Sequence, residues 1–143
     1  MKTISVLKEF SEFPGLRHCN ISENSGEEFY HGLLNSEFKN VLDSKDKLVV
    51  DLDETAGYAS SFLDEAFGNL VFDFTLEIVK KHIEIISNQE PHWKEMIENQ
   101  TFLQWEGRRV KGQNPKVTKI HKSWYRMVGK EIKSDIWETP AVA

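Results

Sequence analysis

The chain has 143 residues, a formal net charge of −5, and 39% apolar against 29% charged side chains, which is typical of one globular domain. No apolar run approaches the ~18 residues of a membrane-spanning helix, and the first ten residues lack the apolar core of a secretory signal. Since Cys19 is the only cysteine, no disulfide can form within the chain, and we expect a cytoplasmic protein with no membrane partner.

The two parts of the chain differ in charge. Residues 1–106 carry 9 basic and 20 acidic side chains, whereas residues 107–143 carry 9 basic and 3 acidic ones. Such a change of sign usually marks a separate functional segment or a tail that folds back on an acidic body. We therefore divide the chain into an acidic domain, residues 1–106, and a basic C-terminal extension, residues 107–143.

A strand and a helix are predicted first. Ile4 and Val6 alternate with polar residues, which indicates an opening strand. Ser25 and Glu28 then have the spacing of a capping box, in which the hydroxyl and the carboxylate each accept a hydrogen bond from a backbone N–H group. Apolar residues follow at steps of three and four positions, as in an amphipathic helix, up to Leu42.

A central strand and a second helix follow. Residues 48–52 form a short, valine-rich apolar run, as expected for a strand covered on both faces. After a loop over residues 53–59, a wide apolar stripe predicts a helix with Ser60 or Ser61 as its N-cap and Asp64 in its first turn.

The acidic domain ends with a further strand and helix. The strand is expected over residues 82–86. Pro91 suits the first position of the last helix, whose buried side would hold Trp93, Met96, Ile97 and Leu103. Strands that alternate with helices imply crossover connections, so the fold class is α/β, with a mixed or largely parallel sheet packed by helices.

The segment from Asp51 to Gly68 resembles a bacterial family of small STAS-like domains of unknown function. The family has a strand that ends in Val-Asp-Leu-Asp, followed by Gly-Tyr and then by a Ser-Ser-Phe-Leu helix start, and the likeness extends over about residues 1–100. Ala59 and Asn69 stand where the family more often has glycine. The family is in turn similar to the anti-anti-sigma type of STAS domain, which implies a GHKL-type protein kinase as partner and a phosphorylated serine at a helix start. Here the matching residue is Ser60, with Ser61 beside it.

Two interpretations of these serines stay open. A helix N-terminus favours a phosphate group through its free N–H groups and its dipole, while nearby acidic residues oppose it. Alternatively, the serine only caps the helix, a role worth roughly 1 kcal/mol. The flanking residues are the expected partner-binding surface, namely Asp53, Glu54, Gly57, Tyr58, Asp64 and Glu65.

The sequence gives weaker indications of catalysis and of metal binding. Asp51, Asp53 and Glu65 are the acids that a small hydrolase or metal enzyme would use at the carboxyl end of a strand. The five histidines show no metal-ligand spacing and no cysteine partner, so we expect them to be scattered. We predict no catalytic residue, no metal site and no cofactor.

The basic extension is predicted to be helical because Val117, Ile120, Trp124 and Ile132 recur at helical spacing, although Gly129 weakens the pattern. Such a helix would pack on the acidic body or bind a protein partner. The alternative is an accessory protein that binds nucleic acid through basic residues of this segment, with Arg108, Arg109, Lys111, Lys119, Lys122 and Arg126 as candidates. The sequence as a whole favours a non-catalytic regulatory module.

Overall fold

The computed structural model describes residues 1–141 and contains a parallel sheet of three strands. The strands are β1 (Lys2–Ser5), β2 (Leu48–Asp51) and β3 (Ile83–Ile86), and β2 lies in the middle. Their register places Val50 between Ile4 and Ile85. All three side chains are buried, which confirms the predicted central strand.

Between β1 and β2 the chain forms α1 (Val6–Glu9) and a long helix built of α2 (Gly26–Phe29), a π-helical turn η1 (Tyr30–Leu34) and α3 (Asn35–Asp43). The opening strand therefore ends at Ser5, before Val6. Ser25 Oγ accepts a hydrogen bond from the Glu28 N–H group at 3.1 Å, as predicted. The Glu28 carboxylate instead accepts from Lys119 Nζ at 2.8 Å, so the capping box is only half formed.

Between β2 and β3 lie α4 (Ser60–Phe74) and α5 (Leu76–His82). The second of these helices was not predicted, and His82 ends it rather than beginning β3. The N-cap of α4 is Ala59, with no side-chain hydrogen bond, so the prediction of a serine cap is wrong by one residue. Asp64 accordingly lies beyond the first turn of α4.

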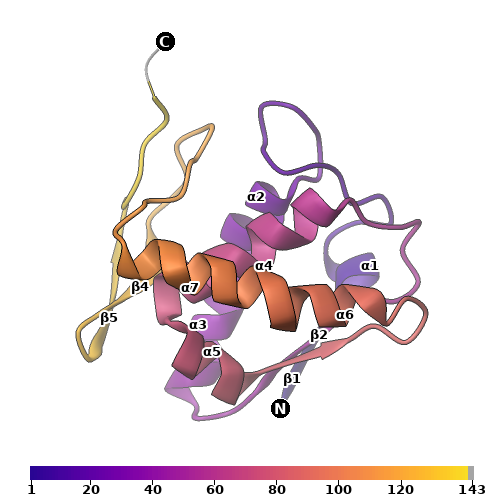
Figure 1. Cartoon of the computed structure of the whole chain (residues 1–143), viewed down its shortest axis with the longest axis horizontal. Coiled ribbons are helices and arrows are strands. Elements are labelled where there is room, and N and C mark those ends of the chain that lie inside the picture. The colour runs from indigo at the N-terminus through magenta and orange to yellow at the C-terminus, as the bar shows by residue number, and fades with distance from the viewer. Residues whose placement is uncertain (142–143) are drawn as a thin grey trace.

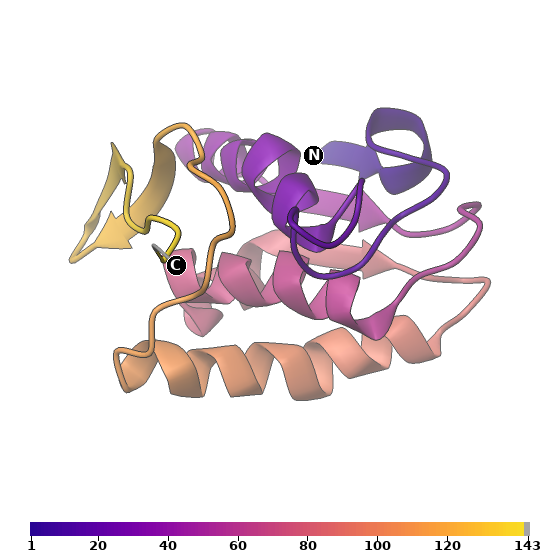
Figure 2. The ribbon, with the colours of Figure 1, turned by 90° about the horizontal axis from the view of Figure 1, so that it is seen from above.

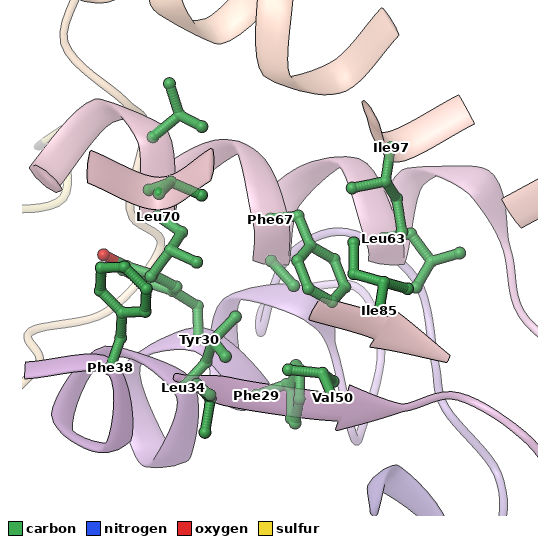
Figure 3. Close-up of a cluster of buried hydrophobic side chains, with 14 of the residues drawn as sticks. Phe29, Tyr30, Leu34, Phe38, Val50, Leu63, Phe67, Leu70, Ile85 and Ile97 are labelled. Carbon is green, nitrogen blue, oxygen red and sulfur yellow. The ribbon is translucent and has the colours of Figure 1, made fainter. Parts of the chain in front are cut away.

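The last long helix consists of α6 (His92–Met96), a π-helical turn η2 (Ile97–Thr101) and α7 (Phe102–Val110), and the division after Glu106 falls inside it. Seen from above, α4 lies between this helix and the α2–α3 helix (Figure 2). Figure 3 shows the core that results, where Leu63 and Phe67 of α4 face Val50 and Ile85 of the sheet.

From residue 111 to residue 141 the basic segment forms no helix, which corrects the predicted helical extension. It forms a loop and then an antiparallel hairpin of β4 (Trp124–Val128) and β5 (Glu131–Asp135). Gly129 makes the tight turn with a φ of +65°, a conformation that suits glycine. The hairpin lies at the opposite end of the molecule from the β2–α4 loop (Figure 1).

The start of helix α4 as a candidate functional site

The loop between β2 and α4 lies at the carboxyl edge of the parallel sheet, where ligands bind in open α/β folds. Two of its hydrogen bonds involve the backbone near its ends: the Tyr58 hydroxyl donates to the Leu52 carbonyl at 2.7 Å, and Ala56 N–H donates to the Glu12 carbonyl at 2.8 Å. Gly57 has a φ of +139°, which a side chain would disfavour. The backbone that leads into α4 is therefore held in one conformation.

The two serines open α4 directly after this loop. Ser60 is the first helical residue and is exposed, whereas Ser61 is half-buried. Since no side chain caps α4, its first N–H groups are not satisfied by a cap and carry the positive end of the helix dipole.

A shallow hollow of about 260 Å³ adjoins Ser60 and is lined by two arginines, Arg17 and Arg108, together with Asp64. Arg17 Nη1 lies 2.7 Å from Asp64 Oδ2 and 3.2 Å from Glu65 Oε1. Two carboxylates that are close to Ser60 in sequence are thus paired with a guanidinium. This reduces their repulsion of an added anion.

The Asp53 carboxylate connects the β2–α4 loop to the loop that follows β3. Its Oδ1 accepts from the Gln89 N–H group at 3.0 Å and its Oδ2 from the Asn88 N–H group at 3.1 Å. Glu54 N–H donates to Gln89 Oε1 at 2.7 Å, and the Glu54 side chain is exposed. A second hollow of about 260 Å³ is lined here by Asp53, Gly57 and Tyr58 with Trp93.

Glu65 is the predicted partner-binding residue that does not reach the surface, since it is only 3% exposed. Asn69 Nδ2 donates to its carboxylate at 2.7 Å. Within residues 1–141, the one group of side chains placed to share a metal ion contains neither Glu65 nor Asp51 and Asp53, the acids of the metal-enzyme hypothesis.

The comparison with family models matches residues 25–93 to a family described as a STAS-like domain of unknown function. The match covers just under half of the chain, and over this range the chain is similar to the family. No curated protein and no solved structure matches the chain. The matched range includes β2, the β2–α4 loop and all of α4, and it ends in α6.

The candidate nucleic-acid residues of the chain lie outside the STAS-like match, and three of them are paired with acids. Arg109 binds Glu106, and Lys119 binds Glu28. Arg126 Nε lies 2.6 Å from Asp73 Oδ1, at the end of α4. Arg108 stacks over the ring of Trp105, while Lys111 and Lys122 are exposed. Nucleic-acid binding by these residues stays a prediction.

A buried carboxylate that the sequence does not single out joins the basic segment to the range that matches the STAS-like family. Glu27 of α2 is fully buried and accepts hydrogen bonds from the Thr118 N–H group at 3.0 Å and from His121 Nε2 at 2.6 Å. Burial alone would raise the pKa of Glu27, but the bonds from His121, Thr118 and Cys19 outweigh it and hold the pKa far below its usual range. Glu27 is therefore an ionised carboxylate inside the protein.

Three histidines gather at Glu27, so the expectation that they are scattered is wrong. His18 Nδ1 lies 3.2 Å from Glu27 Oε1, and the ring of His31 stacks on that of His121 with centroids 3.9 Å apart. Cys19 is beside them, and burial raises its thiol pKa to about 11. The thiol is therefore protonated at neutral pH and is no activated nucleophile.

Within residues 1–141, no helix has both the length and the apolar character needed to cross a membrane.

Proposed function

We propose that the chain is a non-catalytic regulatory module of the bacterial cytoplasm that binds a protein partner at the start of α4. The observation that carries the proposal is the position of Ser60, which is exposed at the first residue of α4, directly after the loop that follows the central strand. Asp53, Glu54, Gly57 and Tyr58 belong to the loop that leads to Ser60, and Asp64 lines the same hollow as Ser60. A partner would bind the surface formed by the β2–α4 loop and the start of α4 without any change in the hydrophobic core.

The partner class we propose is a GHKL-type protein kinase, and the modified residue is Ser60. The support is the resemblance to anti-anti-sigma STAS domains together with the local charge. A phosphate carries a charge of about −1.5 to −2 and would meet the N-terminus of α4. Arg17 and Arg108, which line the same hollow as Ser60, would pair with it. Phosphorylation would thus make this surface more negative while the helix stays folded.

Intact-mass analysis after incubation with ATP and GHKL-type kinases encoded in the same genome tests the proposal. The expected result is one phosphate adduct on the wild-type chain and on Ser61→Ala, and none on Ser60→Ala. The phosphorylated chain would then bind the kinase differently from the unmodified one in a pull-down. An unmodified wild-type chain that also fails to bind any of these kinases contradicts the proposal.

A further inference from the structure

Three side chains with metal-binding atoms meet at the buried end of α2. They come from distant parts of the chain: Cys19 from the loop before α2, Glu27 from α2 itself, and His121 from the segment before β4. One ligand atom of each, the thiol sulphur, a carboxylate oxygen and an imidazole nitrogen, lies within 4.8 Å of the other two. Glu27 and His121 are buried and Cys19 is half-buried.

We propose that Cys19, Glu27 and His121 bind a zinc ion, which would fasten the segment before β4 to helix α2. A thiolate, an imidazole and a carboxylate form a donor set that suits Zn²⁺, whereas Mg²⁺ and Ca²⁺ prefer oxygen ligands alone. Zinc bonds of about 2.0 to 2.3 Å in a tetrahedron separate the donor atoms by roughly 3.3 to 3.6 Å. The three atoms therefore need to move by about an ångström at most, and water takes the fourth position.

The surroundings of the cluster already hold two of the three ligands in place. Glu27 accepts from the Cys19 N–H group at 3.1 Å and from Thr118 Oγ1 at 2.7 Å, and both bonds can persist when the carboxylate binds a metal. The ring of His121 stacks on that of His31 with an angle of 17° between the planes. Outer contacts of this kind orient ligands and commonly contribute 10- to 100-fold to metal affinity.

Binding has a defined chemical balance. The hydrogen bond between His121 Nε2 and Glu27 Oε2 opens. His121 Nε2 gives up its proton by way of solvent, which leaves the ring in the tautomer with its proton on Nδ1, and Nε2 and Glu27 Oε2 each form a bond to the ion. The Cys19 thiol, which now contacts Ser25 Oγ at 3.3 Å, forms a zinc–sulphur bond and releases its proton to solvent. No electron is transferred, and no further reactant is needed.

Titration of the metal-free full-length chain with Co²⁺ as a spectroscopic probe tests the site. We expect one Co²⁺ per chain, a thiolate-to-cobalt charge-transfer band in the near ultraviolet, and loss of the band when Zn²⁺ is added. Cys19→Ser should abolish the band. His121→Gln, which can still hydrogen-bond to Glu27, should weaken Zn²⁺ binding by at least the roughly 10- to 100-fold that loss of an outer contact costs. His92→Gln changes an exposed histidine on α6 and is the matched control. It should leave the charge-transfer band and the Zn²⁺ affinity unchanged.

The proposal is overturned if saturating Co²⁺ produces no charge-transfer band. It is also overturned if His121→Gln binds the metal as tightly as the wild type. If His121→Gln does not fold, calorimetry with Zn²⁺ on Cys19→Ser decides, because this variant replaces a single atom. Unchanged zinc affinity in Cys19→Ser would also overturn the site. None of these outcomes depends on the proposed phosphorylation of Ser60.

Discussion

The side-chain amide of Asn35 forms two hydrogen bonds with the backbone of Tyr125, ninety positions further along the chain. Asn35 Nδ2 donates to the Tyr125 carbonyl at 2.9 Å, and Asn35 Oδ1 accepts from the Tyr125 N–H group at 2.9 Å. The amide thus pairs with β4 as a neighbouring strand would. Asn35 is itself only 1% exposed, so the contact fixes the hairpin against α3 at a buried point.

Asn35→Ala should therefore detach the hairpin. The backbone N–H and carbonyl groups of Tyr125 lose their partner, and we expect the free energy of unfolding to fall by about 2 kcal/mol. Urea unfolding measures the loss, and hydrogen exchange should show faster exchange over Trp124–Val128 than in the wild type. Asn40→Ala changes an exposed asparagine of the same helix and should have little effect on either measurement. Equal effects of the two variants would contradict this role.

Two glycines in helices should respond to alanine in opposite directions. A Cβ atom on Gly68 of α4 would lie 2.1 Å from the ring of Trp105, so Gly68→Ala should cost about 1 to 3 kcal/mol of stability. Nothing lies within 4 Å of the corresponding atom on Gly107 of α7. Gly107→Ala should raise stability by about 0.5 to 1 kcal/mol, because alanine favours the helix. Thermal unfolding of both variants checks the pair, and a stabilised Gly68→Ala would refute the close packing of α4 on α7.

Glu65 should make stability depend on pH. Burial raises the pKa of Glu65 even though His18, Asn69 and Arg17 act against it. Above the ordinary pKa of about 4.5 the unfolded chain has lost this proton while the folded chain still holds it, so stability falls as pH rises towards the raised pKa. Glu65→Gln cannot titrate. Its stability relative to the wild type should therefore increase between pH 4 and pH 7 in urea unfolding, whereas parallel curves would contradict the raised pKa.

A negative charge at Ser60 should stabilise α4. Ser60→Asp places a carboxylate in the first turn, near the positive end of the helix dipole and in the hollow with Arg17 and Arg108. We expect an increase of about 0.5 kcal/mol over Ser60→Asn, a neutral side chain of the same shape, and a smaller difference at high salt. Thermal unfolding at two salt concentrations measures it. Equal stability of the two variants at low salt would argue against a phosphate-accepting helix start.

The local pattern of the sequence predicted the elements that fill the core. The apolar spacing after Ser25 and the valine-rich run of β2 were interpreted correctly, because each pattern reports which face of one element is buried. The last helix shows how such a pattern fails. The π-helical turn η2 changes the phase of the apolar stripe, so Phe102 and Trp105 are buried and Leu103 is 54% exposed.

The basic segment was misread because its apolar residues fit two periods. Trp124 and Ile132 lie at helical spacing, but Gly129 and Lys130 form a two-residue turn after a strand that holds Trp124, Tyr125 and Val128. Gly129 was the residue whose presence in the sequence could have indicated this turn. The Glu27 cluster had no such signal, since its contacts with Thr118 and His121 span more than ninety positions, and spacing along the chain does not reveal contacts of that range.

The contacts of Glu27 also limit how the gene can be shortened. Thr118 and His121 supply three of the hydrogen bonds to this carboxylate, so a product that stops near residue 110 would keep a charge inside the protein and lose most of its compensation. Loss of the basic segment should therefore destabilise the acidic part, so the two parts of the chain form one folding unit and not two independent domains.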